Sequence, residues 1–362
     1  MQTMVKGSTT ASEGVDERES LLGMTLARLG VLAEGFGQPA YAAAQLADWL
    51  YKKGATDVAS MANLSKTFRA SLDSAFVVGR AAPEHETVSA DGTKKYLFGT
   101  GHGRFVEAAY IPESDRATLC LSTQVGCKMG CLFCMTGKQG FQGNLDPGDI
   151  LNQYASLPER EKITNIVYMG MGEPLDNLEN VLASLEVLTA PWGYAMSPRR
   201  ITVSSVGIIP GLEAFLERSE CHLAISLHSP FDEERRSLMP VQNVYPIGEV
   251  LELLKTSKIA RRRRISFEYI MLGGLNDTGR HARELVRILS GIRCRVNLIR
   301  FHPIPDTPLR RSPDETMFAF EEQLKRAGVM TTIRKSRGQD ILAACGLLST
   351  KALGELKPQV GF

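Results

Sequence analysis

The chain has 362 residues, of which 43% are hydrophobic and 23% are charged, and its formal net charge at pH 7 is only +2. This length can bury a large core, so we expect one large domain with a smaller one beside it. Seven cysteines, an odd number at uneven spacing, argue against the disulfide framework of a secreted protein, and no apolar run approaches the ~18 residues of a membrane span. We therefore expect a cytoplasmic protein that does not bind membranes.

The first part of the chain differs in composition from the remainder. Residues 1–20 are rich in Ser, Thr, Gly and Glu and lack an apolar segment, which predicts a disordered tail and not a signal peptide. From residue 21 to about 78, apolar residues recur at helical spacing. Asp91-Gly92 then indicates a tight turn, and the strand-like runs on either side of Gly101 predict a hairpin that leads into the core. We expect residues 21–95 to form an accessory helical domain with a hairpin linker.

After residue 95, short β-branched runs alternate with segments of helical periodicity such as 177–189, 246–257 and 279–290. The runs lie near residues 116–122, 165–171, 199–206, 222–228, 265–272 and 295–301. Repeated strand–helix units predict a parallel sheet, and six units are too few to close an eight-stranded barrel. The expected fold class is therefore α/β, an open partial (β/α)6 barrel over residues 96–350, with an extension strand near 329–335 and a C-terminal tail at 351–362.

Three cysteines follow the first of these strands, where the loops of such barrels carry function. Cys127, Cys131 and Cys134 are spaced so that their thiolates can hold three irons of a [4Fe-4S] cluster, and no fourth Cys follows nearby, so the fourth iron stays open. The competing interpretation is a zinc site, but structural zinc prefers four ligands from two paired clusters, and no second pair is present. An open iron can bind S-adenosylmethionine (SAM) and cleave it to a 5'-deoxyadenosyl radical.

The cysteine loop, with Phe133 before its last Cys, resembles that of the radical SAM superfamily. Four further motifs stand in the order and spacing of the RlmN/Cfr family of radical SAM RNA adenine methyltransferases: Met169-Gly-Met-Gly-Glu-Pro174, Ser226-Leu-His-Ser-Pro230, Leu238-Met-Pro240 and Ala343-Ala-Cys-Gly346. The resemblance covers roughly residues 35 to 350, and it implies a radical SAM barrel with a [4Fe-4S] cluster on the three-cysteine loop.

The resemblance also implies a set of SAM contacts, namely Gly172, Glu173, Ser204, Ser226, Leu227, His228 and His302. A carboxylate such as Glu173 beside a backbone bend suits the cationic amine of SAM. Taken alone, the serines and His228 would be ordinary strand-end residues. Many family members carry Asn at the position of His302, which is a departure here, although His donates a similar hydrogen bond.

Three residues match the catalytic positions of the family. Cys345 corresponds to the cysteine that takes a methyl group from a first SAM, while a second SAM supplies the radical, so two SAM molecules are consumed per turnover. Cys120 corresponds to the cysteine that later forms a transient disulfide with Cys345. Glu107 corresponds to the acceptor of the ring-carbon proton. Without the resemblance, Cys345 would be interpreted as an inert thiol and Glu107 as a solvated strand acid.

The family resemblance favours an RlmN-type enzyme, which methylates C2 of an adenine in 23S rRNA, at the peptidyl transferase centre, and of the adenine next to the anticodon in some tRNAs. It implies 23S rRNA, tRNA and an electron donor such as flavodoxin or ferredoxin as partners of a monomer. A Cfr-type enzyme, which methylates C8 of the same rRNA adenine and gives antibiotic resistance, is an alternative, although Gly-Glu-Pro at 172–174 favours the RlmN type. A noncatalytic RNA-binding protein with a structural metal is a third interpretation.

Because the net charge is close to zero, RNA binding must come from local basic patches. Arg261 to Arg264 form a run of four, and Arg199-Arg200, Lys94-Lys95 and Arg334-Lys335 add to it. Arg suits phosphate, but such a run is equally compatible with a solvated face. The target adenine must be unstacked to react, which favours an exposed RNA loop over a paired helix.

Overall fold

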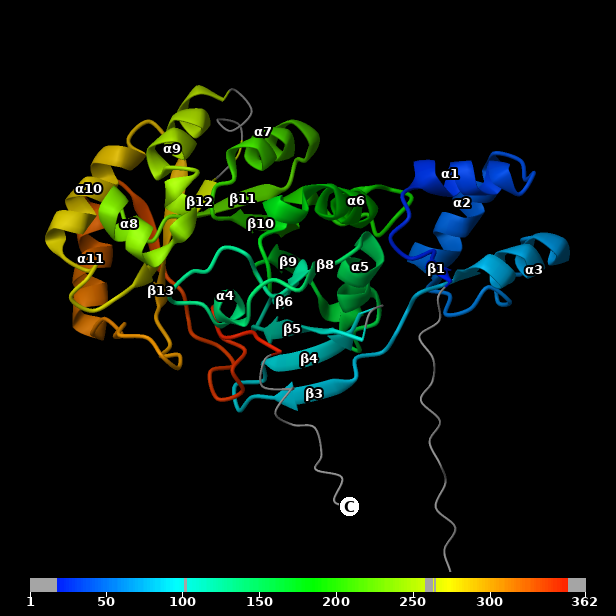
Figure 1. Ribbon diagram of the computed structural model, residues 1–362, viewed down its shortest axis with the longest axis horizontal. Coiled ribbons are helices and arrows are strands. Elements are labelled where there is room, and N and C mark those ends of the chain that lie inside the picture. Colours follow the sequence, from blue (N-terminus) through cyan, green and yellow to red (C-terminus); the bar gives the residue numbers. More distant parts are fainter. Residues whose placement is uncertain (1–17, 101–102, 258–262, 264, 351–362) are drawn as a thin grey trace, which may run out of the picture.

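The computed structural model describes residues 18–100, 103–257, 263 and 265–350 (Figure 1). Ten strands form one mixed sheet in the order β14-β13-β12-β11-β10-β9-β6-β5-β4-β3. The six predicted barrel strands are β6 (Ala117–Cys120), β9 (Asn165–Tyr168), β10 (Ile201–Ser205), β11 (His222–Ser226), β12 (Ile265–Met271) and β13 (Cys294–Arg300). Each runs parallel to its neighbour, so the open partial (β/α)6 barrel is confirmed.

Further strands extend the barrel at both edges. The predicted extension strand, β14 (Met330–Ile333), pairs in parallel with β13. At the other edge, β5 (Phe105–Pro112) and β4 (Lys94–Gly99) form the predicted antiparallel hairpin, and an unpredicted strand, β3 (His85–Val88), joins β4. The predicted division of the chain near residue 95 stays a prediction, although β3 and β4 are part of the main sheet.

Helices cover the outer face of the parallel strands (Figure 1). Three helices correspond to the predicted helical segments: α6 (Leu178–Thr189), α9 (Ile247–Thr256) and α10 (Gly279–Leu289). The barrel region also contains α4 (Met135–Gln139), α5 (Pro147–Ala155), α7 (Ile209–Arg218), α8 (Asp232–Leu238) and α11 (Asp314–Arg326). Val203 of β10 and Ile225 of β11 are fully buried in the hydrophobic core between sheet and helices. Burial of these apolar side chains supplies the main stabilisation of the barrel.

The N-terminal helices form a lobe at one side of the sheet (Figure 1). They are α1 (Leu26–Gly35), α2 (Tyr41–Ala47) and α3 (Lys66–Ala75), and β1 (Glu19–Ser20) pairs with β2 (Phe76–Val77) beside them. Thr25 and Ser65 cap α1 and α3 by accepting main-chain hydrogen bonds. The buried Tyr51 packs against Trp192, with ring centroids 5.9 Å apart, and so joins this lobe to the barrel. Within the described residues, no helix is long and apolar enough to cross a membrane.

The inner face of the barrel is polar, because side chains alternate between the two faces of a strand. Five barrel strands and the extension strand β14 each contribute a hydroxyl or amide group to the cavity there: Thr118, Asn165, Thr202, Ser266, Asn297 and, from β14, Thr332. The carboxyl ends of the strands lie at one edge of this cavity, where the predicted site residues follow β6, β9, β10, β11 and β13. The fold therefore places these residues around one opening.

Candidate active site

The three-cysteine loop lies between the short strand β7 (Gln124–Val125) and α4. Gly126 allows its first turn, because it has φ +72° and a Cβ there would collide with the main chain of Gly140. Two hydrogen bonds hold the loop from opposite sides: the Leu132 N–H donates to the Leu238 oxygen at 2.9 Å, and the Met135 N–H donates to the Gly346 oxygen at 2.8 Å. The loop is thus fixed both to the end of α8 and to the segment that carries Cys345.

The thiols of this loop fit an iron–sulfur cluster. Burial and the neighbouring thiols raise the pKa of Cys131 well above its usual value, and burial raises that of Cys127 to about 12. A bound metal centre reverses this effect, because coordination keeps the thiolates ionised. No three His, Cys, Asp or Glu side chains of the described chain are grouped as ligands of one metal ion. Three thiols on one short loop suit a cluster, in which each thiolate binds a different iron.

Glu173 follows β9 and is 3% exposed. Its carboxylate accepts hydrogen bonds from the Leu175 and Val206 N–H groups, both at 3.0 Å. Burial raises the pKa of Glu173 to about 7. A cationic amine bound beside it would favour the ionised form. The preceding Gly172 has φ +96°, and a side chain there would collide with Gln124, so the bend requires glycine.

His228 follows β11 in a left-handed backbone conformation, with φ +58°. Its Nδ1 accepts a hydrogen bond from the Ile270 N–H at 3.0 Å, and burial, together with the Arg235 charge, lowers its pKa to about 3. The ring is therefore neutral and carries its proton on Nε2. Asn276 donates to the His228 oxygen at 2.7 Å and helps to hold the strained backbone. The ring contacts Phe133 of the cysteine loop, with centroids 4.7 Å apart.

The other predicted SAM contacts come from neighbouring strands. Ser204 lies in β10 and Ser226 ends β11, both half-buried, and Leu227 is fully buried after β11. His302 lies after β13 and lines the inner cavity together with Cys345. Burial lowers the pKa of His302, and its Nδ1 has no hydrogen-bond partner within the described residues. A neutral imidazole with an unused ring nitrogen is suited to bind a ligand there.

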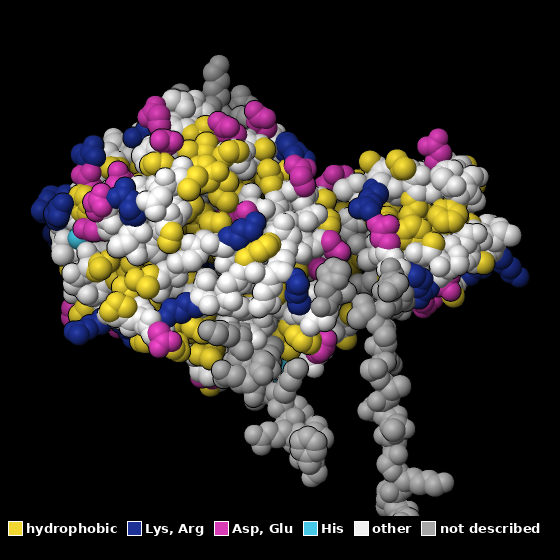
Figure 2. All heavy atoms as spheres, in the orientation of Figure 1, with side chains coloured by type: hydrophobic (Ala, Val, Ile, Leu, Met, Phe, Trp, Pro, Cys, Tyr) yellow, Lys and Arg dark blue, Asp and Glu magenta, His cyan; other side chains and the backbone are white. Residues whose placement is uncertain are grey.

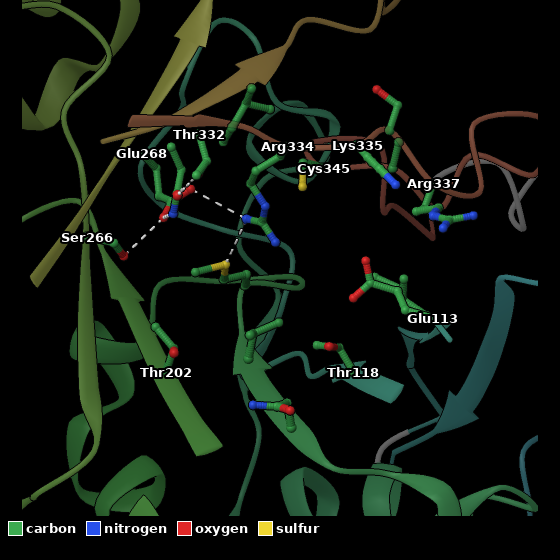
Figure 3. Close-up of a pocket in the computed structure, with 18 of the residues that line it drawn as sticks. Glu113, Thr118, Thr202, Ser266, Glu268, Thr332, Arg334, Lys335, Arg337 and Cys345 are labelled. Atoms are coloured by element: carbon green, nitrogen blue, oxygen red, sulfur yellow. Dashed lines mark hydrogen bonds and ion pairs between the residues drawn. The ribbon is translucent and has the colours of Figure 1, made fainter. Parts of the chain in front are cut away.

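A cavity of about 470 Å³ occupies the inside of the barrel (Figure 3). Cys345 faces it next to Arg334, which makes an ion pair with Glu268 at 3.4 Å. The Cys345 thiolate, followed by Glu268 and Cys120, raises the pKa of Arg334 above its usual value. Arg334 therefore lies close to both predicted catalytic cysteines. The sequence had indicated only an RNA-binding role for Arg334. Its position near the end of a predicted strand could have indicated that it lies in the active site.

Glu107 lies on β5 on the same face as Ala109, which is opposite Cys120 of β6. The carboxylate is almost buried and makes an ion pair with Lys95 at 2.9 Å, and it accepts a hydrogen bond from the Ser349 N–H at 2.9 Å. Burial raises the pKa of Glu107, whereas Lys95 opposes this rise. Sequence reasoning missed Lys95 as a partner of Glu107.

The structure brings Cys120 and Cys345 near one another but does not join them. Burial, with a smaller effect of Cys345, raises the pKa of Cys120 to about 12. All seven cysteines are free thiols, and Cys345 is exposed. The disulfide implied by the family resemblance is thus not formed in this structure, and any such bond must form transiently.

The predicted basic patches lie in different environments in the structure. Within the run 261–264 the structure describes only Arg263, which donates to the main-chain oxygens of Leu216 and Cys221 at 2.9 and 3.2 Å. Lys94 is engaged by Glu86 and Glu159. The other two patches, Arg199-Arg200 and Arg334-Lys335, line the inner cavity together with Arg295 and Arg337. On the face shown in Figure 2, Lys and Arg are scattered among Asp and Glu.

The fold and the three-cysteine loop define a radical SAM enzyme. The family model of the radical SAM superfamily matches residues 121–289, and the model of the ribosomal RNA large subunit methyltransferase N-terminal domain matches residues 19–78. A solved radical SAM methyltransferase from Sphaerobacter thermophilus is 39% identical with a TM-score of 0.85, and the match covers 91% of this chain and 99% of that one.

Curated relatives show which radical SAM enzymes this chain resembles. The probable dual-specificity RNA methyltransferase RlmN of Parabacteroides distasonis is 57% identical over 93% of this chain and 98% of its own length. The dual-specificity RNA methyltransferase RlmN of Syntrophus aciditrophicus is 42% identical over 93% of this chain and 98% of its own length. The chain belongs to the RlmN family of radical SAM RNA methyltransferases. This class implies a [4Fe-4S] cluster and SAM, which the cysteine loop and the residues around it fit.

Proposed function

We propose that this protein methylates C2 of an adenine in 23S rRNA, at the peptidyl transferase centre, and of the adenine next to the anticodon in some tRNAs, through a methylated Cys345. The single observation that carries the proposal is the proximity of three residues: Cys345 interacts electrostatically with Cys120, and the segment that follows Cys345 is hydrogen-bonded to Glu107 through the Ser349 N–H. A noncatalytic RNA-binding protein would need neither the pair of cysteines nor the buried acid.

The cofactors supply a methyl group and, by one-electron cleavage of SAM, a 5'-deoxyadenosyl radical. In this proposal, Cys127, Cys131 and Cys134 hold the cluster, and Glu173 accepts a hydrogen bond from the amine of SAM. Gly172, Ser204, Ser226, Leu227, His228 and His302 form the rest of the SAM pocket. The Nε2–H of His228 is a fixed donor there, and its neutral ring does not repel the sulfonium. Two SAM molecules are consumed per turnover.

The catalytic residues act in sequence on the adenine. Cys345, exposed to the cavity and next to the Arg334 cation, carries the methyl carbon that becomes bonded to C2. Glu107 then takes the proton from C2. Cys120 attacks the Cys345 sulfur, so that a sulfur–sulfur bond forms while the sulfur–carbon bond to the product breaks, and the methylated base leaves. Since burial keeps the Cys120 thiol protonated, it must lose its proton during this attack. The methylene carbon that leaves the Cys345 sulfur with the bonding electron pair takes up one proton and becomes the methyl group.

RNA approaches, in this proposal, through the opening of the barrel cavity. Arg199 and Arg200 directly precede β10, where they are exposed and line the cavity at the amino ends of the strands, and Lys335 lies on the same cavity as Cys345 (Figure 3). Cations at the opening of a site suit the phosphates that flank an unstacked adenine. The protein would act as a monomer that receives electrons from flavodoxin or ferredoxin.

The test is anaerobic incubation of the reconstituted protein with SAM, a reductant and unmodified 23S rRNA, followed by nucleoside mass spectrometry. The proposal predicts 2-methyladenosine. An 8-methyladenosine product would instead assign the Cfr-type reaction, and SAM cleavage without either product would refute the proposed substrate. The same assay with tRNA tests the second substrate class.

A further inference from the structure

Arg235 of α8 is the largest fully buried side chain of the described structure. Its guanidinium donates hydrogen bonds only to neutral oxygens. These acceptors are the main-chain oxygens of Val206 at 2.8 Å, Ser226 at 3.1 Å and Leu227 at 3.2 Å, and the side-chain oxygen of Gln242 at 2.5 Å. One guanidinium thus joins the backbone after β10 to the backbone at the end of β11, where the SAM pocket is proposed.

The charge of Arg235 has no direct anionic partner. Within the described residues, Arg235 makes no ion pair with a carboxylate; Asp232 accepts a hydrogen bond from the Gln242 amide at 2.8 Å and, like Cys131, interacts with Arg235 electrostatically. Burial lowers the pKa of Arg235 to about 10, so the guanidinium remains charged at neutral pH. A buried charge without a partner is strongly unfavourable. A negative charge that completes the site is therefore expected nearby.

The cysteine loop is the neighbouring source of negative charge. Leu238, at the end of α8, accepts a hydrogen bond from Leu132 of that loop at 2.9 Å. Leu238 and Met239 also pack in one apolar cluster with Cys131. The electrostatic interaction between Cys131 and Arg235 agrees with this arrangement. Arg235 thus lies on the helix that contacts the loop, and within range of one thiolate.

We propose that Arg235 is the buried counter-charge of the iron–sulfur cluster and also a positioning residue that fixes the backbone of the SAM pocket. Three thiolates give the cluster a net negative charge, and its one-electron reduction adds another. A fixed cation in a low-dielectric interior stabilises the reduced form, because net charge and hydrogen bonding set the reduction potential. The inference rests on the cluster of the proposed function and not on its RNA substrate.

The test compares Arg235→Gln and Arg235→Lys with the wild type and with Arg263→Gln in redox titrations of the reconstituted cluster, followed by electron paramagnetic resonance. Loss of the charge in Arg235→Gln is expected to lower the reduced-to-oxidised ratio at a fixed potential about tenfold, which corresponds to about 59 mV for one electron. Arg235→Lys keeps the charge and is expected to stay close to the wild type. Binding of SAM is expected to weaken in both variants, since both lose hydrogen bonds to the pocket backbone.

Arg263→Gln is the matched control. Arg263, like Arg235, donates to main-chain oxygens, but it lies just before β12, at the amino ends of the strands. Its loss is expected to lower the melting temperature and leave the cluster potential unchanged. An iron-loaded Arg235→Gln protein with the wild-type potential would overturn the counter-charge role.

A variant that fails to hold iron still gives a result. If Arg235→Gln loses the cluster whereas Arg235→Lys retains full iron and sulfide content, the charge is required and the proposal stands. If Arg235→Lys loses iron to the same extent, hydrogen bonding and not charge is responsible, and the proposal is wrong. A wild-type protein without a [4Fe-4S] cluster would refute the proposed function itself, whereas an unchanged potential in the variant would refute only this inference.

Discussion

Replacing Lys95 with Met should impair proton abstraction by Glu107. The ammonium and the carboxylate lie 2.9 Å apart, with side-chain exposures of 16% and 8%. At an effective dielectric constant of about 20, two charges at this distance attract by roughly 6 kcal/mol. Desolvation of the ammonium offsets most of this attraction. We expect a net loss of about 1.4–2.8 kcal/mol in the ionised base, which is about a tenfold to hundredfold loss of rate at pH 7.

The sign of the pH dependence follows from the environment of Glu107. Burial raises its pKa and Lys95 lowers it, so removing Lys95 raises the pKa further. A general base is active only when it is deprotonated, so the ascending limb of the rate profile should move to higher pH in Lys95→Met. Activity that is lost at pH 7 should therefore be partly recovered at higher pH. Lys95→Arg keeps the charge and should retain most of the rate.

The assay is single-turnover methylation with adenine carrying hydrogen or deuterium at C2. Slower proton abstraction should increase the kinetic isotope effect, a change that a general loss of folding would not produce. Lys94→Met is the matched control, because Lys94 is adjacent on β4 and pairs with Glu86 and Glu159 instead of Glu107. If Lys95→Met and Lys94→Met show the same pH profile and isotope effect, the reasoning about Lys95 is refuted.

Three further results are expected. Cys120→Ala should accumulate a covalent protein–RNA adduct, visible on a denaturing gel, and normal turnover would exclude its role in release. Without SAM, the folding stability of the wild type should depend on pH, because burial raises the pKa of Glu173 to about 7 in the folded protein. This stabilisation is fully present below the usual carboxylate pKa, and about 3 kcal/mol of it is lost as pH rises through 7. Glu173→Gln should remove this pH dependence. Thermal melts of both proteins from pH 5 to 8 test this, and parallel curves would contradict it. Replacing Arg199 and Arg200 with Ala should reduce the slope of log affinity against log salt by about 1.5, and an unchanged slope would remove them from the RNA interface.

The parts of the fold that a local pattern specifies were predictable. Six β-branched runs with helical segments between them identify the barrel strands, and the spacing of three cysteines identifies the cluster loop. The pairing of Lys95 with Glu107 was not predictable, because it depends on the register in which Leu97 lies opposite Glu107. A shift of one residue would bring Lys94 to that face instead. Sequence alone does not determine this register.

The helix that carries Arg235 shows a second limit of the sequence. Residues 232–236 read Asp-Glu-Glu-Arg-Arg, a pattern typical of a solvated helix with ion pairs three residues apart. Arg236 follows that pattern and pairs with Glu233 on the surface. Arg235, one position earlier, points into the protein and is fully buried. Only the tertiary position of α8 against the loops after β10 and β11 distinguishes two adjacent arginines.

The segment after Cys345 connects parts of the site that are far apart in the sequence. The main-chain oxygens of Gly346 and Leu348 accept hydrogen bonds from Met135 and Thr136 at the start of α4, and the Ser349 N–H donates to Glu107. The chain is thus fixed immediately after an exposed thiol. In the proposed mechanism, this arrangement would let the Cys345 side chain move between SAM, adenine and Cys120 while the cluster loop and Glu107 keep their positions. Loss of the hydrogen bond from the Ser349 N–H to Glu107 should therefore slow proton abstraction more than it slows methyl transfer to Cys345.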